Sequence, residues 1–157
     1  MNNLEIPIYN KEAFNGMRKA GSFAAQVLDE LMPMIKPNIS TLEINNFCHD
    51  IIIKNNAIPA PLNYRGFPKS VCTSVNHVVC HGIPSQSKIL KDGDIINVDV
   101  TVIIDGWYGD SSRMYVAGNI NKKIYSLLQT TYECLLIGIK NALPGKNLGD
   151  IGFEIQQ

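Results

Sequence analysis

The chain has 157 residues, a length that fits a single domain of ordinary size. Hydrophobic residues make up 45%, enough for a buried core, and 14 basic residues balance 14 acidic ones. The balanced charge gives no long-range field that would favour nucleic acid, so no DNA partner is expected. The apolar runs are too short to cross a bilayer, and the residues after Met1 lack the basic and apolar regions of a signal peptide. We therefore expect a cytoplasmic protein without a membrane partner.

Cysteine usage agrees with a reducing compartment. None of the four cysteines forms a CxxC pair, which weakens both a structural zinc site and a redox function based on Cys72 and Cys80. Disulfides are not expected in such a compartment. Cys48 and Cys134 are therefore interpreted as small buried hydrophobic residues.

Two amphipathic helices are predicted at the start of the chain. Asn10 can cap the first, whose apolar residues recur three and four positions apart. They are Phe14, Met17, Ala20, Ala24, Val27, Leu28 and Leu31. Pro37 ends this pattern, and Ser40 with Glu43 forms a capping box that opens the second helix. The apolar side of the second helix contains Ile44, Phe47, Cys48, Ile51 and Ile52.

From about residue 59 to residue 114 the pattern changes to strands and turns. Short β-branched runs alternate with Gly, Pro and Asp. Residues 71–75 and 78–80 are predicted as short strands, and His81 with Gly82 follows the second of them. A histidine at a strand end before a glycine turn is well placed to face a cleft. Taken alone, however, a single histidine is more often a surface or core residue.

Residues 94–114 predict a β-hairpin. The even positions from 96 to 104 are apolar and the odd positions 97, 99 and 101 are polar, which is the period of a strand with one buried face. Asp105-Gly106 is a preferred pair for a two-residue turn. That turn places Thr101 opposite Asp110 and makes Asp99 a diagonal neighbour of Asp110 on the same face, roughly 7–8 Å away. A three-residue loop would place the two aspartates on opposite faces of the hairpin, unless a bulge restored the alternation of side chains.

Two carboxylates that face one point beside an apolar sheet are costly without a compensating cation. A divalent metal, or a pair of metals about 3.5–4 Å apart, would supply that charge. The alternative is a solvated polar face balanced by Arg113 or a lysine. Spacing alone leaves both interpretations open.

The end of the chain repeats the helix-breaking and helix-capping residues found near its beginning. Asn121 can cap a third helix that contains Ile124, Leu127, Leu128, Thr131 and Leu135. One constant shift then aligns Pro37 with Pro144, Ser40 with Asn147, Glu43 with Asp150 and Ile44 with Ile151. Chance matching is the alternative. The repeat predicts a first pseudo-repeat at residues 10–117 and the start of a second at 121–157, with about 70 or more further residues needed to complete it.

Two strings carry a family resemblance, YRGFPKSVCTSVNHVVCHGIP and LKDGDIINVDVTVIIDGWYGDSSRMYVAG. Together they resemble type I methionine aminopeptidases of peptidase family M24, and the likeness runs from about Met17 to the end. It implies the α+β pita-bread fold of creatinases and aminopeptidases, which has two related halves. The chain is then a single catalytic domain over residues 1–157 with a complete first half, an antiparallel sheet covered by helices, and a truncated second half.

The resemblance also implies the active-site roles of three residues. Asp99 corresponds to the bidentate ligand of one metal, and Asp110 to the carboxylate that bridges two metals. His81 corresponds to the catalytic histidine that binds the substrate near the scissile amide. The further His and two Glu ligands of the family would lie beyond Gln157.

Five more residues are assigned by the resemblance. Tyr64, Phe67 and Cys72 correspond to the pocket for the methionine side chain. Asn76 and Val78 correspond to positions where some members bind a monovalent cation through backbone oxygens. The family often has a cysteine and a glycine before the pocket tyrosine, where this chain has residues 61–63, Pro-Leu-Asn.

The implied function is removal of the N-terminal methionine from nascent proteins with a small second residue. Two divalent ions (Mn, Fe, Co or Zn) would activate a bridging water. The ribosome is a candidate partner, the full-length protein is expected to be a monomer, and this chain alone is expected to be inactive. The alternatives are another pita-bread peptidase, such as a prolidase relative, and a non-catalytic binding module on the same scaffold.

Overall fold

The computed structural model describes residues 6–157 and contains two compact units, Met1–Asn119 and Ile120–Gln157. The predicted absence of a signal peptide concerns residues 1–5, which lie outside the described residues. In the part of the chain that the structure describes, no helix is long and apolar enough to cross a membrane. The pair of pseudo-repeats stays a prediction, and each unit is described by itself.

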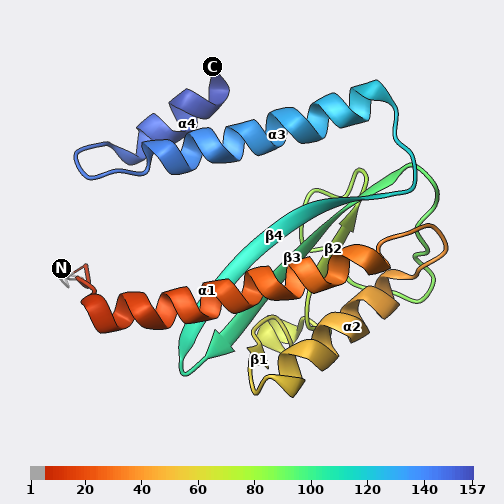
Figure 1. Cartoon of the computed structure of the whole chain (residues 1–157), viewed down its shortest axis with the longest axis horizontal. Coiled ribbons are helices and arrows are strands. Elements are labelled where there is room, and N and C mark those ends of the chain that lie inside the picture. The colour runs from red at the N-terminus through yellow and green to blue at the C-terminus, as the bar shows by residue number, and fades with distance from the viewer. Residues whose placement is uncertain (1–5) are drawn as a thin grey trace. The chain divides into compact units, whose positions relative to one another are not determined.

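The first unit contains a sheet with helices on one face (Figure 1). Its helices are α1 (Lys11–Leu31), the short 3₁₀ helices η1 (Met32–Met34) and η2 (Tyr64–Gly66), and α2 (Thr41–Lys54). Its strands are β1 (Ile58–Pro59), β2 (Cys72–Val75), β3 (Asp94–Ile104) and β4 (Trp107–Ala117).

Strand β3 is the centre of an antiparallel sheet. Strand β4 pairs along one edge of β3, while β1 and β2 pair with different parts of its other edge. Cys72 of β2 is the partner of Asp99, and Ile58 of β1 is the partner of Ile103. Asp105 and Gly106 join β3 to β4 with positive φ angles of 51° and 81°, as the predicted two-residue hairpin turn requires.

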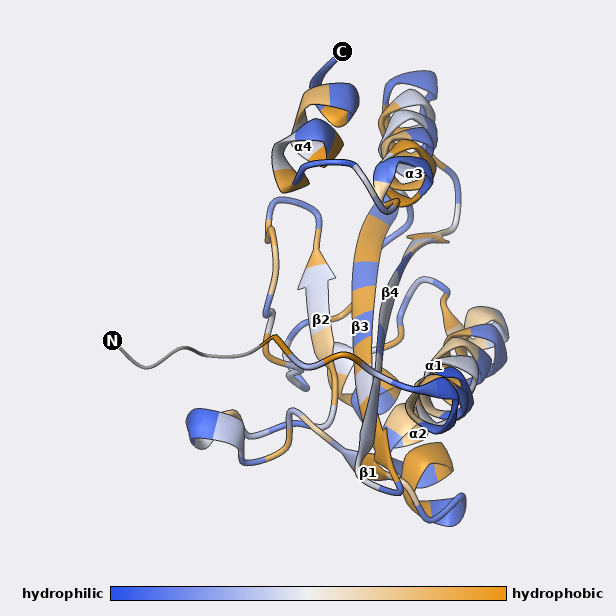
Figure 2. Ribbon diagram, turned by 90° about the vertical axis from the view of Figure 1, so that its left-hand side faces the viewer, coloured by the Kyte–Doolittle hydropathy of each residue, from blue (hydrophilic) through white to orange (hydrophobic). Residues whose placement is uncertain are grey.

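The two faces of β3 differ as the alternating pattern predicts, and Figure 2 shows hydrophobic and hydrophilic residues alternating along this strand. Its four fully buried residues are Ile96, Val98, Val100 and Val102. They belong to one core with the buried residues of α1 and α2. Asn97, Asp99 and Thr101 lie on the other face of β3, away from this core.

Helix α1 lies close against β4. The Tyr115 hydroxyl donates a hydrogen bond to the Leu28 carbonyl at 2.6 Å, and burial raises the pKa of Tyr115 to about 12. At Gly109 a Cβ atom would overlap the Ala20 carbonyl, so only glycine permits this approach of helix to strand. These contacts fix the helix layer behind the hairpin.

The predicted helix starts are confirmed. The Asn10 side chain accepts from the Ala13 N–H at 3.0 Å. In the capping box of α2, the Ser40 N–H donates to Glu43 at 2.9 Å and the Glu43 N–H donates to Ser40 Oγ at 3.2 Å. Backbone donors that a helix start leaves unpaired are thereby satisfied.

The predicted apolar side of α1 is wrong in its first two turns. Phe14 and Met17 are 53% and 48% exposed, although the same stripe is buried from Ala20 onward. A Cβ atom at Gly16 would overlap the Trp107 side chain, so α1 meets the end of the hairpin near this residue. Figure 1 shows the first turns of α1 extending past the hairpin turn, where no strand covers them.

The predicted strand at residues 78–80 is also wrong. Strand β2 ends at Val75 because Asn76 adopts a left-handed conformation with φ 54°. The Asn76 side chain donates to Asp94 Oδ1 at 2.8 Å and accepts from the Ile95 N–H at 3.1 Å. Asn76 therefore turns the chain out of the sheet, and the β-branched residues that follow lie in a loop.

The second unit is a pair of helices, α3 (Lys122–Asn141) and α4 (Leu148–Gln156). Asn121 caps α3 as predicted, by accepting from the Ile124 N–H at 3.0 Å. Helix α4 contacts α3 at Gly138, where an added Cβ would lie 3.1 Å from Ile155. Leu127 and Leu135 remain 58% and 53% exposed, so this contact buries only part of the apolar stripe of α3.

Candidate functional site

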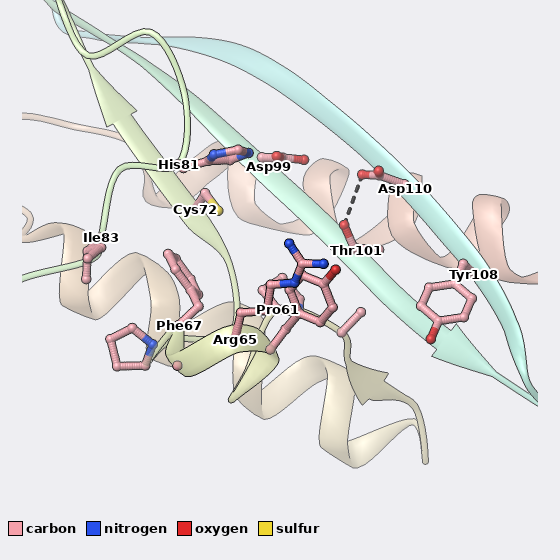
Figure 3. Close-up of a pocket in the computed structure, with 14 residues that line it drawn as sticks. Pro61, Arg65, Phe67, Cys72, His81, Ile83, Asp99, Thr101, Tyr108 and Asp110 are labelled. Carbon is pink, nitrogen blue, oxygen red and sulfur yellow. Dashed lines mark hydrogen bonds between the residues drawn. The ribbon is translucent and has the colours of Figure 1, made fainter.

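A pocket of about 820 Å³ lies on the sheet face opposite the helices (Figure 3). Strands β2, β3 and β4 supply one side of it, and the segment from residue 60 to residue 68 supplies another. The lining residues are Ala60, Pro61, Tyr64, Arg65, Gly66, Phe67, Pro68, Cys72, His81, Ile83, Asp99, Thr101, Tyr108 and Asp110. Six of the eight residues predicted for a site are therefore brought together.

The two aspartates lie on the same face of the hairpin, as the predicted register requires. Thr101 of β3 pairs with Asp110 of β4, and Asp99 pairs with Ser112. Asp99 and Asp110 are consequently diagonal neighbours, and both line the pocket. The Thr101 hydroxyl donates to Asp110 Oδ1 at 3.0 Å, which holds this carboxylate in one orientation (Figure 3).

Neither Asp99 nor Asp110 forms an ion pair with another side chain of the described residues. Within residues 6–157 the ion pairs join Lys19 to Asp105 and Arg113 to Asp29. The alternative in which Arg113 balances the site is wrong, because Arg113 occupies the helix-facing side of β4 and bonds Asp29 of α1 at 2.6 Å. The acidic side of the pocket thus has two carboxylates without an ion-pair partner among the described residues.

This charge is reflected in the pKa of Asp99. Burial raises its pKa above the ordinary value, the negative charge of Asp110 raises it further, and the nearby His81 opposes the rise. Carboxylate oxygens that repel each other at one point are suitable donors for a divalent cation. The residues present fit part of a metal site. In the region that the structure describes, no group of three or more His, Cys, Asp or Glu side chains could hold an ion.

His81 reaches the pocket from a loop that is fixed to β2. The Thr73 N–H donates to the Gly82 carbonyl at 2.8 Å, and the Gly82 N–H donates to Ser74 Oγ at 3.2 Å. A Cβ atom at position 82 would overlap the Thr73 carbonyl, which explains the glycine. Figure 3 shows the His81 ring directed towards Asp99, whereas the exposed His77 is not among the lining residues.

One backbone hydrogen bond joins the apolar wall to the sheet, and another closes the wall segment on itself. The Ala60 N–H donates to the Thr101 carbonyl at 2.9 Å, and the Asn63 N–H donates to the Phe67 carbonyl at 2.8 Å. Tyr64, Phe67 and Cys72 all line the pocket, as does Pro61 from the segment that departs from the family pattern.

Cys72 contributes to this wall as a neutral thiol. Burial raises its pKa to about 11, with smaller contributions from Asp99, Cys80 and Asp110. A thiol with so high a pKa is a poor nucleophile near neutral pH. This property argues against the redox function that would use Cys72 and Cys80.

Asn76 and Val78 are the two predicted residues that do not line the pocket. The Asn76 side chain is committed to the start of β3 through Asp94 and Ile95. The monovalent-cation role of these residues stays a prediction.

Arg65 and Tyr108 line the pocket but were not predicted from the sequence. A signal for Tyr108 was available, because it lies two residues before Asp110 and shares its strand face. Arg65 lies in a turn with φ 48°, where strand alternation does not apply.

Residues 15–157 match the sequence profile described as Metallopeptidase family M24. The chain belongs to this family. It is 55% identical over 153 residues to a methionine aminopeptidase of Rickettsia prowazekii (strain Madrid E), and 46% identical over 155 residues to that of Escherichia coli (strain K12). Each match covers 98% of this chain and 59% of the relative. The chain therefore spans about three fifths of the length of the curated relatives it matches.

Solved structures show the same likeness. The methionine aminopeptidase of Rickettsia prowazekii superposes with a TM-score of 0.94 at 56% identity, over 96% of this chain and 60% of that one. That of Thermotoga maritima gives 0.92 at 34% identity, over 96% and 61%. The prolidase of Pyrococcus furiosus gives 0.80 at 19% identity, over 95% and 42%, and shows the fold alone. The α+β pita-bread fold is confirmed, and membership of a metallopeptidase family implies divalent metal as the cofactor.

Proposed function

We propose that this chain supplies the substrate pocket and two of the metal ligands of a methionine aminopeptidase, which removes the first residue of nascent peptides that begin with methionine and a small second residue. One observation carries this proposal. The register of a single hairpin brings Asp99 and Asp110 to one pocket, together with His81 and an apolar wall. The two methionine aminopeptidase relatives support it.

Asp99 and Asp110 would hold the divalent ions, and Thr101 would keep Asp110 oriented through its hydrogen bond. Bound divalent ions supply Lewis-acid polarisation of a carbonyl and a water of lowered pKa. The oxygen donors suit Mn, Fe, Co or Zn. A monovalent cation at the backbone oxygens of Asn76 and Val78 belongs to the same proposal.

The other residues bind and orient the peptide. The His81 ring, held by its loop beside Asp99, would donate a hydrogen bond to the substrate near the scissile amide and stabilise charge that develops there. Tyr64, Phe67 and Cys72 would accept an unbranched apolar side chain and exclude water from it. The neutral form of Cys72 suits that role.

The proposal also includes the compartment, the partner and the oligomeric state of the full-length protein. Localisation in the cytoplasm belongs to the same proposal. The ribosome would be the partner that presents nascent chains, and the full-length protein would act as a monomer. A prolidase-like activity is not favoured, because the prolidase is only 19% identical to this chain.

Binding of methionine peptides tests the proposal directly. Calorimetry with Zn²⁺ present should detect binding of Met-Ala-Ser and weaker binding of Val-Ala-Ser, whose branched first residue fits the wall less well. His81→Ala should weaken binding of Met-Ala-Ser, and His77→Ala serves as the matched control. A larger loss in the His77 variant would contradict the assignment of His81.

The proposal also predicts low activity of this chain. Asp99 and Asp110 alone should hold metal weakly, because no third ligand group accompanies them within residues 6–157. Hydrolysis of Met-Ala-Ser should therefore be negligible. Turnover that a chelator abolishes and Mn²⁺ or Co²⁺ restores would show that these residues suffice.

A further inference from the structure

Arg65 places a guanidinium group in the pocket without an acidic partner from the described chain. It lines the same pocket as Asp99 and Asp110. The ion pairs among residues 6–157 involve other side chains, so this charge is available to a ligand. Figure 3 shows the guanidinium extending from the 60–68 segment into the space that faces β3 and β4.

The backbone presents Arg65 in a defined turn. Arg65 has a left-handed conformation with φ 48°, and its neighbours Asn63 and Gly66 also have positive φ angles, of 67° and 86°. The Phe67 N–H donates to the Tyr64 carbonyl at 2.9 Å and closes the turn around Arg65. A non-glycine residue in this conformation is unfavourable unless its surroundings impose it, which is typical of functional sites.

The Tyr64 ring orients the side chain of Arg65. The guanidinium carbon lies 5.4 Å from the centre of this ring, within the range of a cation–π contact. Such a contact leaves the N–H groups at the edge of the guanidinium plane free to donate. A planar guanidinium with free edge donors matches a carboxylate with two parallel hydrogen bonds.

The pocket is therefore acidic at one side and basic at another. Asp99 and Asp110 supply the acidic side, where the proposed function places the metals. Arg65 comes from the opposite wall. A ligand that spans the pocket would carry its amine at the aspartates and a negative group at Arg65. For a peptide, that negative group must lie beyond the first residue.

We propose that Arg65 binds a carboxylate of the substrate downstream of the first residue and so determines a preference among methionine peptides. This inference rests on the proposed function. The carboxylate has two possible sources, an acidic side chain at the third residue or the terminal carboxylate of a short peptide. Both present the same two oxygens to the guanidinium.

Two matched peptide pairs distinguish these sources by calorimetry with Zn²⁺ present. Met-Ala-Ser as the free acid is compared with its C-terminal amide, and Met-Ala-Asp-amide is compared with Met-Ala-Asn-amide. Because Arg65 is exposed, each carboxylate form that reaches it should bind only about threefold to tenfold more tightly than its neutral partner. The preference should weaken as salt is added.

The variants separate Arg65 from general charge effects. Arg65→Ala should abolish the preference, and Arg65→Lys should retain only part of it, because an ammonium group lacks the planar fork. Lys69→Ala is the control, since it removes the same charge nearby from a residue that does not line the pocket. Circular dichroism establishes that each variant is folded, and the Lys variant tests the proposal if the Ala variant is not.

Each outcome has one meaning. Equal binding of both members of both pairs by the unmodified chain overturns the role of Arg65 and leaves the proposed function intact. A preference that persists in Arg65→Ala, or disappears equally in Lys69→Ala, also overturns it. Absence of binding by every methionine peptide overturns both proposals.

Discussion

Thr101 and Asp110 face each other across the two arms of one hairpin, and the Thr101 hydroxyl donates to Asp110 Oδ1 at 3.0 Å. The bond occupies one oxygen of a carboxylate that lines the pocket. Thr101 therefore orients a proposed metal ligand without being one. Metal affinity should therefore depend less on Thr101 than on a residue that binds the metal directly.

Thr101→Val should weaken metal affinity less than Asp99→Asn. The first change removes one neutral donor to a ligand and should cost about tenfold in affinity. The second removes a charged oxygen donor and should cost more. Calorimetric titration of both variants with Zn²⁺ provides the comparison, and equal losses would mean that Asp99 does not bind the metal.

Asp99→Asn should stabilise the chain when metal is absent. Burial and the charge of Asp110 both raise the pKa of Asp99, so its ionised form is unfavourable in the folded protein at neutral pH. Removing that charge should raise the melting temperature by about 1–3 °C in EDTA. Thermal unfolding followed by circular dichroism measures the shift. Asp105→Asn is the control, because Asp105 is ion-paired with Lys19 and should not show the gain.

Gly82→Ala should disturb the His81 loop. The added methyl group would overlap the Thr73 carbonyl, so the loop must move at a cost of about 1–3 kcal/mol in the free energy of unfolding. NMR signals of the His81 ring should shift at the same time. Gly21→Ala adds the same methyl in open space within α1 and should be neutral or stabilising. Equal stability of the two variants would contradict the close approach at Gly82.

The stability of the fold should fall when Glu43 is protonated. Hydrogen bonds from the Ser40 hydroxyl and then from the Ser40 N–H lower the pKa of Glu43 below its ordinary value. Its contribution is therefore complete above the ordinary pKa and is lost as the pH falls through the lowered one. Urea unfolding from pH 7 to pH 3 should show a smaller decline in Glu43→Gln. An unchanged decline would exclude this carboxylate as a source of the acid sensitivity.

Local sequence rules predicted the features that depend on a few neighbouring residues. The Ser40 capping box needs only residues 40–43, and the Asp105-Gly106 turn fixes the pairing of Thr101 with Asp110. Both predictions are confirmed. The placement of Asp99 and Asp110 in one pocket follows from the same register.

The wrong predictions concern features that depend on distant contacts. Phe14 belongs to an apolar stripe, but its burial depends on where the hairpin ends. The residues after Val75 favour a strand, but Asn76 bonds Asp94 and Ile95 and turns the chain away. Arg65 was missed because the direction of its side chain depends on a left-handed turn, and an arginine in the sequence does not predict such a turn.

The hairpin that carries Asp99 and Asp110 requires a fixed number of residues between these two aspartates. Both side chains reach the pocket because the turn between them contains two residues and neither arm is interrupted. Insertion of one residue anywhere between them, without a compensating bulge, would rotate one carboxylate to the face that α1 covers. The hairpin can therefore be lengthened or shortened between Asp99 and Asp110 only in steps that keep both side chains on the pocket face.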